Sequence, residues 1–248
     1  MLLEIKKASQ YRKIDDFGNN LIISGESPRL DVFRFASNSD TTNRTLHAYM
    51  GDSMEKIIIK KDLFCLPWTQ TILGTHYRGK PNFMALAWLT RVNKQPAMIG
   101  ICVNNSHASN EAIRETGEFS VNVPSADMVE IADYTGLVSG KSVDKSGLFE
   151  VFYGDLTAAP MIKRCPITVE CKLAHTVELP TNTFFIGEII NLYSEERYLT
   201  EGMPDAKKTN SFILTMPDNH YRVLGESVGK AWSAGKVLKD RIEKGESS

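Results

Sequence analysis

The stretch KPNFMALAWLTRVNKQPAMIGICVNNSHASNEAIRETGEFSVNVP, from Lys80 to Pro124, carries the densest structural signal in this chain. It predicts two apolar strands joined by a polar corner, then a polar loop, a short helix and a further strand. The loop Asn104 to Ser109 falls where a buried strand ends and the helix begins. Free backbone N–H groups at a helix start, beside hydroxyl and amide side chains, suit a phosphate. A planar, phosphorylated ligand is therefore the first hypothesis.

The composition is that of an ordinary globular protein and excludes several classes. The chain has 248 residues, of which 42% are hydrophobic and 24% charged, with a formal net charge of −1. This charge balance argues against a nucleic-acid or anionic-membrane partner. No apolar run approaches the ~20 residues that a membrane-spanning helix needs. The first residues lack the apolar core of a signal peptide, so we expect a cytoplasmic location.

The cysteines and histidines do not form a recognisable reactive or metal-binding motif. Cys65, Cys102, Cys165 and Cys171 form no C-x-x-C pair and have no histidine at a zinc-ligand spacing. We therefore expect buried, reduced thiols and no metal site. No nucleophile lies in an elbow-type motif, and no side chain is identified as catalytic.

Residues 1–53 differ from the rest of the chain, because their apolar residues follow no strand or helix period. They fit a small strand-and-loop unit, a floppy leader, or a translated upstream segment with the native start at Met54. We predict an extension of uncertain structure over 1–53 and a main domain over 54–248.

The main domain is predicted to be mainly β with short helices. Strands are expected over 69–76, 82–89, 97–103, 119–123 and 212–216, with a long hairpin formed by 167–179 and 184–193. Helices are expected over 109–116, ended by Gly117, and from Ser125 to Gly136, and the tail from Gly225 is helix-prone. Strands and helices do not alternate regularly, and no G-x-G-x-x-G or P-loop motif is present. This favours an antiparallel barrel with helical insertions.

Three groups of polar or aromatic residues are candidates for the ligand site, and each has a structural alternative. Asn82 and Trp88 fit a ring-binding amide and indole, or else a strand Asn and a core Trp. The loop Asn104 to Ser109 fits a phosphate, or else Ser106 or Ser109 simply N-caps the helix. Lys145, in SVDKSG, fits a pocket cation or a solvated loop lysine.

A series of motifs then points to one family. NFMALAWLTRVNKQPAMIGICVNNSHASNEAIRETGEFSVNVP is followed by TGLVSGKSVDK, APMIKRCPITVECKL, LPTNTFFIGEI and YRVLGESVGKAWSAGK. From about Met54 to Lys236 the chain resembles the flavin reductase-like, FMN-binding split-barrel proteins, and within them the flavoredoxin branch. Residues 1–53 have no counterpart in this resemblance.

The resemblance implies a homodimeric split β-barrel that holds FMN non-covalently. It implies NAD(P)H-linked flavin reduction or electron transfer between a small-molecule donor and acceptor. The segment Ser106 to Ser109 matches the family's S-H-x-T phosphate segment, and Lys145 the lysine beside the flavin. The full set of cofactor-binding residues it implies is Asn82, Trp88, Leu89, Thr90, Asn104, Ser106, His107, Ser109 and Lys145. It places Asn182 and Tyr221 at the substrate pocket.

Two departures from the family bear on activity. Asn182 stands where the family often has His, and an amide cannot exchange a proton near neutral pH. Ser146 stands where the residue after the lysine is commonly Phe. Both departures keep open a second interpretation, a non-catalytic flavin carrier on the same barrel. A more distant alternative is a barrel that binds haem or pyridoxal phosphate.

Overall fold

The computed structural model describes residues 11–14, 20–23, 56–58 and 66–245, which divide into two units. One unit comprises Ile57–Lys230, and the other comprises Met1–Lys56 with Ala231–Ser248. In the second unit, strands β1 (Tyr11–Ile14) and β2 (Asn20–Ile23) pair antiparallel, and helix α5 spans Lys236–Lys244. Most of the predicted extension over 1–53, the predicted start at Met54 and Cys65 lie outside the described residues. The boundary at residue 54 therefore stays a prediction.

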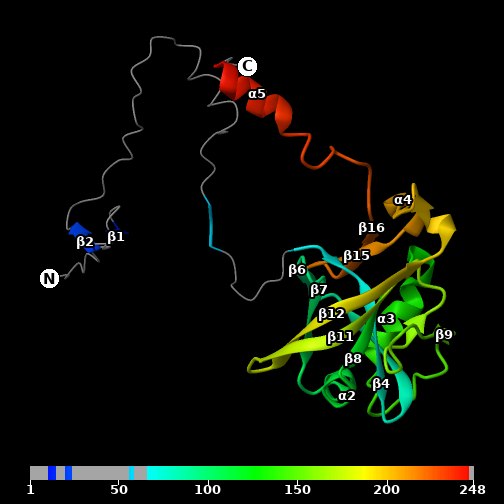
Figure 1. The fold of residues 1–248 in the computed structure, drawn as a ribbon. Helices are drawn as coiled ribbons and strands as arrows, with labels where there is room; N and C mark the ends of the chain where they lie inside the picture. The colour runs from blue at the N-terminus through cyan, green and yellow to red at the C-terminus, as the bar shows by residue number, and fades with distance from the viewer. Residues whose placement is uncertain (1–10, 15–19, 24–55, 59–65, 246–248) are drawn as a thin grey trace. The chain divides into compact units, whose positions relative to one another are not determined.

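The first unit is built on one antiparallel sheet of seven strands (Figure 1). Its strands pair in the order β5-β4-β8-β11-β12-β7-β6. They are β4 (Thr71–Tyr77), β5 (Lys80–Leu86), β6 (Leu89–Asn93), β7 (Met98–Asn104), β8 (Glu118–Val123), β11 (Ile167–Glu178) and β12 (Asn182–Ser194). These strands confirm a mainly β fold.

The connection between β5 and β6 forces this sheet to close into a barrel. Neighbouring strands lie ~4.8 Å apart, so the outer strands of a flat seven-stranded sheet would be about 29 Å apart. Only Ala87 and Trp88 separate β5 from β6, and the chain from Leu86 to Leu89 spans at most about 11 Å. The two outer strands must therefore approach each other without pairing, which leaves a seam in the barrel wall at Ala87 and Trp88.

The helices and the smaller sheets are insertions around this barrel. Helix α2 (Ala108–Thr116) follows β7, and a 3-10 turn (Ala126–Met128) leads into α3 (Val129–Leu137). Strands β16 (His220–Val223), β15 (Phe212–Thr215) and β3 (Trp68–Thr69) form a three-stranded sheet. The remaining elements are β9 (Val151–Phe152), β10 (Met161–Ile162), a 3-10 turn (Glu196–Tyr198), β13 (Leu199–Thr200), β14 (Met203–Pro204) and α4 (Ala206–Thr209).

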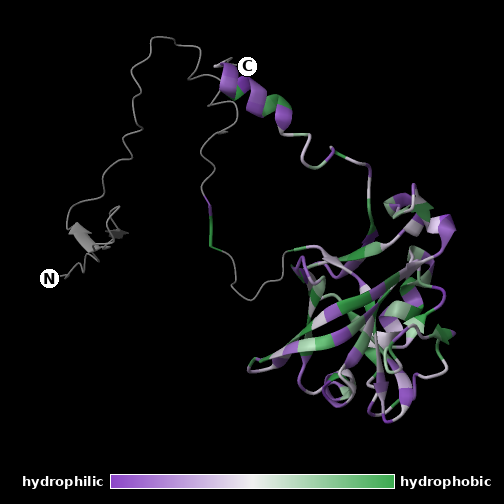
Figure 2. Ribbon diagram, viewed as in Figure 1, coloured by the Kyte–Doolittle hydropathy of each residue, from purple (hydrophilic) through white to green (hydrophobic). Residues whose placement is uncertain are grey.

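The core follows from alternation along the strands. The first half of β12 alternates half-buried and buried residues, and Figure 2 shows mixed hydropathy along β11 and β12. The buried core of the barrel includes Leu73, Ile101, Phe119, Val121 and Phe185. Gly187 of β12 lies directly against Phe119, since a Cβ at Gly187 would be 2.5 Å from the Phe119 ring. The inward-facing side chains thus fill the barrel.

Most of the predicted elements are confirmed, with small shifts at their ends. Helix α2 ends at Gly117, whose φ of 68° is the left-handed conformation expected of this cap. The second predicted helix begins as a 3-10 turn, and Gly136 lies inside α3 instead of ending it. Cys165 and Cys171 are buried free thiols, whereas Cys102 is only half-buried.

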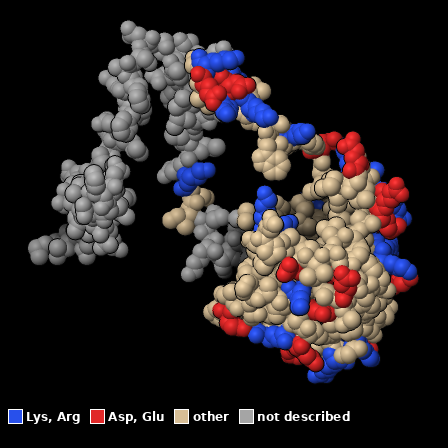
Figure 3. All heavy atoms as spheres, in the orientation of Figure 1, with Lys and Arg blue, Asp and Glu red and all other residues tan. Residues whose placement is uncertain are grey.

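The surface of the described part carries both signs of charge. Figure 3 shows Lys and Arg interspersed with Asp and Glu around the face of the barrel unit in view. Within the described ranges, no helix is long and apolar enough to cross a membrane. Those ranges also contain no cluster of three His, Cys, Asp or Glu side chains able to hold a metal ion.

Candidate functional site

Two pockets meet beside the seam of the barrel. Pocket A, about 210 Å³, is lined by Asn82, Ser109 and Lys145 among others. Pocket B, about 280 Å³, is lined by Trp88 and by residues of β5, β7 and β12. Met84 and His107 line both pockets, so the two adjoin. Together they reach the lower part of the ~300–1,000 Å³ typical of ligand sites.

Asn82 is buried in the wall of pocket A and is only partly satisfied. It is 5% exposed, and its Nδ2 donates to Thr75 Oγ1 at 3.2 Å and to Ser109 Oγ at 3.1 Å. Its Oδ1 has no hydrogen-bond partner among the described residues. A buried acceptor without a partner is costly, so this oxygen marks a place where a ligand donor would be stabilising.

Gly140 packs closely against that oxygen. A Cβ at position 140 would lie 2.2 Å from Asn82 Oδ1 and 3.2 Å from the Cβ of Ala108. Because any side chain there would clash with that oxygen, the close approach itself requires glycine. The loop containing Gly140 and the strand containing Asn82 therefore form one wall of the pocket.

Lys145 is a buried cation, so the solvated-lysine alternative is wrong. Its side chain is almost fully enclosed, and Nζ donates to the backbone carbonyls of Phe83 and Thr135, both at 2.8 Å. Burial lowers the pKa of Lys145 to about 8, because desolvation penalises the charged form. Two carbonyls occupy two of the three ammonium protons, which leaves one donor for a group in the pocket.

The loop Asn104 to Ser109 is organised differently from a simple helix cap. The N-cap of α2 is His107, which makes no side-chain cap bond, so neither serine caps the helix. Asn104 Oδ1 accepts from both the backbone N–H of Ser106, at 2.9 Å, and its hydroxyl, at 2.7 Å. Ser109 is buried and accepts from Asn82. The first N–H groups of α2 are therefore not engaged by a side chain of the N-cap residue.

The electrostatics at this loop favour an anion. The pKa of His107 is lowered, chiefly by desolvation and further by the positive charges of Lys145 and Lys141. His107 is thus neutral near pH 7, whereas the ammonium groups of Lys145 and Lys141 place positive charge near it. Lys141 is itself paired with Glu111 on α2, which leaves Lys145 as the less screened of the two.

Trp88 and Asn182 both line pocket B. Trp88, at the seam, is 38% exposed, so the core-tryptophan alternative is wrong. Asn182 begins β12 and pairs in register with Asn104 of β7. Its Oδ1 accepts from the hydroxyl of Thr181 at 2.8 Å. The position where the family often has His is therefore inside the same pocket as the indole.

Four predicted residues line neither pocket. Leu89 packs on the barrel core, and Thr90 is exposed on the outer strand β6. Ser106 is exposed in the loop, with its hydroxyl held by Asn104. Tyr221 lies apart from the pockets, since its hydroxyl donates to Asp133 of α3 at 2.7 Å and its ring packs on Phe212. Their roles stay predictions.

Sequence reasoning missed Gly140, Thr75 and Met84. Gly140 contacts Asn82, on a strand about sixty positions earlier, so no local pattern marks it. Thr75 pairs with Asn82 across the β4–β5 hairpin, so pairing the predicted strands 69–76 and 82–89 would have placed Thr75 beside Asn82. Met84 lies two positions from Asn82, where strand alternation places it on the same face.

A larger pocket, about 780 Å³, lies elsewhere, against Phe149, Cys165 and Tyr193. Its charged groups already have partners: Lys163 pairs with Glu150 at 2.5 Å, and Arg164 with Asp127 at 2.6 Å. None of the predicted site residues lines it. We therefore place the candidate site at pockets A and B.

Comparison with known proteins identifies the relatives of this chain. A family model described as flavin reductase like domain matches residues 63–224. The crystal structure of flavoredoxin from Methanosarcina acetivorans is 54% identical, with a TM-score of 0.73, and the match covers 75% of this chain and 100% of that one. Flavoredoxin of Desulfovibrio vulgaris (Miyazaki F) is 33% identical, with a TM-score of 0.68 and coverage of 73% and 100%.

A curated relative carries an activity in its name. The FMN reductase (NADH) of Pseudomonas syringae pv. syringae is 26% identical over 119 residues, which are 46% of this chain and 62% of that protein. The family model covers more than half of the chain, and the flavoredoxin structures are matched along their full length. The chain belongs to the flavin reductase-like family, and within it to the flavoredoxin branch, with the split-barrel fold of that family.

Proposed function

We propose that this protein binds FMN non-covalently in pockets A and B and acts as an oxidoreductase of the flavoredoxin type. The observation that carries this is the buried Asn82 Oδ1, an acceptor without a partner in the described structure, which lies against Gly140 in the wall of pocket A. A flavin ring offers an N–H donor at its pyrimidine edge. Asn82 is therefore suited to that edge, and the one unused donor of Lys145 to a ring oxygen.

The remaining parts of the site suit the rest of the cofactor. Trp88, which is 38% exposed in pocket B, could stack its indole on a planar ring. The N-terminus of α2 offers backbone donors to the phosphate, and the Ser106 hydroxyl becomes a further donor if it turns away from Asn104. Each of these roles matches the hydrogen-bond donors, acceptors or ring surface that the group offers.

When bound, FMN would supply hydride or electron acceptance at its central ring. The contribution of the chain is binding and electrostatics. Lys145 would place a positive charge near the pyrimidine end of the ring, where a reduced flavin carries negative charge, and so would favour the reduced state. The aromatic and apolar side chains that line pocket B would contact the ring.

Flavin titration tests the cofactor. Adding the purified protein to FMN should quench flavin fluorescence with a saturable curve, and the protein should retain a yellow colour after desalting. Gly140→Ala should weaken binding, because its Cβ would clash with Asn82 Oδ1 and displace that side chain, whereas Gly147→Ala, which meets nothing within 4 Å, is the control. A colourless protein that leaves FMN fluorescence unchanged would rule the proposal out.

NAD(P)H linkage is proposed from the family chemistry and is tested separately. Anaerobic mixing of the FMN-loaded protein with NADH, and in parallel with NADPH, should bleach the flavin absorbance near 450 nm at a catalytic rate. The competing function is a flavin carrier, favoured by Asn182, because an amide in pocket B cannot exchange a proton. Bound flavin that neither nucleotide reduces would favour the carrier.

A further inference from the structure

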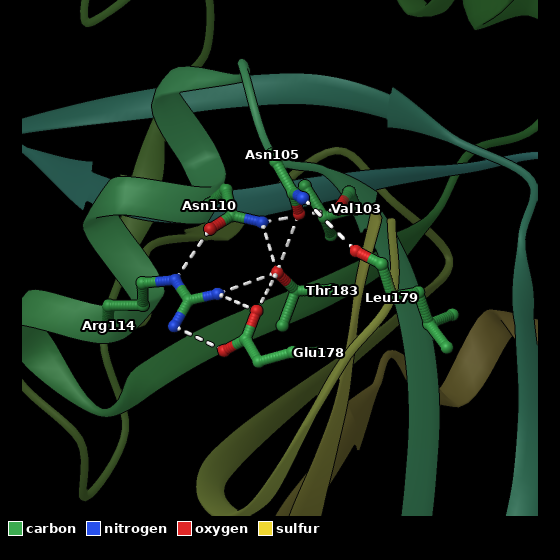
Figure 4. Close-up of polar contacts among 7 residues, drawn as sticks. All are labelled: Val103, Asn105, Asn110, Arg114, Glu178, Leu179 and Thr183. Atoms are coloured by element: carbon green, nitrogen blue, oxygen red, sulfur yellow. Dashed lines mark hydrogen bonds and ion pairs between the residues drawn. The ribbon is translucent and has the colours of Figure 1, made fainter. Parts of the chain in front are cut away.

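A buried polar network connects helix α2, the loop before it and the turn of the β11–β12 hairpin (Figure 4). Its centre is the hydroxyl of Thr183, whose residue is fully buried at the start of β12. Thr183 Oγ1 lies 2.8 Å from Asn105 Oδ1, 3.0 Å from Asn110 Nδ2 and 2.7 Å from Arg114 Nη2. One hydroxyl at the start of β12 thus contacts both helix α2 and the loop before it, which are about 70 positions or more away in sequence.

The bonding capacity of this hydroxyl is fully used. A threonine hydroxyl has one proton and two acceptor lone pairs. Amide and guanidinium nitrogens only donate, so Asn110 and Arg114 take the two lone pairs and the proton goes to Asn105 Oδ1. The weaker approach of Glu178 Oε2, at 3.4 Å, then adds little. A saturated, buried hydroxyl has a single orientation, which makes it a rigid junction.

The network fixes Asn105, the second residue of the phosphate-binding loop predicted from the sequence. Its backbone N–H donates to Thr181 at 3.0 Å, and its Nδ2 to the Leu179 carbonyl at 3.3 Å. Its Oδ1 accepts from Thr183. Backbone and both ends of the side chain are therefore held by the hairpin turn, and Ser106 and His107 follow directly. The path of the loop into α2 depends on these contacts.

The exposed part of the network, the ion pair between Arg114 and Glu178, contributes less to holding the loop in place. Arg114 binds both carboxylate oxygens of Glu178 at 2.8 Å, and it lowers the pKa of Glu178. The Glu178 side chain is 60% exposed, however, and exposed ion pairs stabilise by only ~0–1 kcal/mol. Without Glu178, the side chain of Arg114 would still be held in place by its hydrogen bond to Asn110 Oδ1, at 2.8 Å. The junction therefore depends on Thr183 more than on the ion pair.

We propose that Thr183 is a positioning residue that holds the loop Asn104 to Ser109 in the conformation that binds the phosphate of FMN. This inference rests on the proposed function. It assigns no contact with the ligand to Thr183, which acts through Asn105. The prediction is therefore specific: losing the hydroxyl weakens the recognition of the phosphate more than that of the ring.

The experiment compares FMN with riboflavin, which has the same ring and no phosphate. Dissociation constants for both flavins are measured by fluorescence quenching for the wild type, Thr183→Val and Thr183→Ser. For Thr183→Val we expect the FMN constant to rise about tenfold, as for one lost hydrogen bond, with the riboflavin constant unchanged. Thr183→Ser keeps the hydroxyl and should restore FMN binding. Glu178→Gln, which removes only the exposed ion pair, should stay close to the wild type.

Asn105→Ala provides a second route, because this residue is exposed and its replacement leaves the core intact. It should show the same selective loss of FMN affinity. Equal losses for both flavins in Thr183→Val and Asn105→Ala, or no loss, would overturn the positioning role while FMN binding by the wild type stands. A wild type that binds neither flavin would instead overturn the proposed function, and the positioning role with it.

Discussion

The ammonium group of Lys145 lies between the carbonyls of Phe83 and Thr135, in the wall that Asn82 also lines. An exposed lysine keeps its proton to about pH 10.4, whereas burial lowers the pKa of this one to about 8. The charge that the site offers to a ligand is therefore lost within a readily accessible pH range. His107, already neutral near pH 7, adds no positive charge there.

FMN affinity should fall as the pH rises from 7 to 9, because Lys145 loses its proton near the middle of that interval. Loss of one favourable charge interaction of about 1 kcal/mol raises the dissociation constant roughly fivefold. Fluorescence titrations at pH 7, 8 and 9 measure this. Lys145→Met, which keeps an unbranched side chain without the charge, should bind more weakly and equally at the three pH values. A wild-type constant that does not change with pH would refute the role of the charge.

The same shift has a defined sign in folding. Between about pH 8 and 10.5 the unfolded chain keeps the Lys145 proton and the folded chain has released it. The unfolded state then binds more protons, so the contribution of this residue to the free energy of unfolding rises with pH across that interval. Below pH 8 Lys145 is protonated in both states, so the burial of its charge lowers the free energy of unfolding by an amount that does not change with pH.

Among the elements, the strands show most clearly what sequence patterns determine. The hairpin β11–β12 and the strands β5 and β7 were predicted within a few residues, because alternation and apolar runs are local properties. The ends of α3 were less predictable. Its 3-10 start and its continuation through Gly136 depend on packing against β5, where a Cβ on Gly136 would be only 3.0 Å from Ala85.

Packing between β8 and β12 makes Gly187→Ala destabilising. The new Cβ would lie 2.5 Å from Phe119 Cζ and 3.1 Å from the Cβ of Cys171, and overpacking of this kind costs about 1–3 kcal/mol. Urea unfolding of the wild type and the variant gives the difference in free energy of unfolding. Gly225→Ala, which meets nothing within 4 Å, should change it by less than about 0.5 kcal/mol.

A double mutant identifies the contact responsible. Phe119→Leu removes the ring edge that the new methyl group would meet, so it should recover part of the stability lost in Gly187→Ala. Strictly additive effects of the two substitutions would mean that the ring is not the obstacle.

For the whole molecule, homodimerisation remains a proposal that comes from the family resemblance. Pockets A and B are bordered by exposed apolar side chains, including Leu137, 74% exposed, and Trp88. A partner chain covering this border would remove apolar surface from water and enclose the flavin. The structure of one chain contains the binding groups and leaves this side of them open.

Sedimentation velocity at micromolar concentration should therefore give a species with the mass of two chains, with and without FMN. Leu137→Glu places a charge at the border of pocket A and should shift the protein towards the monomer and weaken FMN binding together. A wild type that sediments as a monomer in both conditions would count against a shared site.

How much of the site could be predicted from the sequence depends on how far apart in the chain the contacting residues lie. Asn82, Trp88 and the loop before α2 lie within 28 positions of one another, and the motifs there were sufficient to nominate them. The burial of Lys145 depends on carbonyls 62 and 10 positions away, and the Thr183 junction on residues more than 68 positions away. Such contacts exist only once the barrel has closed, so no local pattern predicts them.

Opening the barrel wall between β5 and β6 would break no ladder hydrogen bonds of the sheet. In the described structure β5 and β6 are the two outer strands, and each pairs on one side only. A slight separation of these two strands would leave all six ladders between neighbouring strands intact. Admission of a flat molecule would then be limited by side-chain motion, on timescales of nanoseconds to microseconds, instead of by local unfolding. A ligand that enters between β5 and β6 would therefore leave the hydrogen-bonded sheet unchanged.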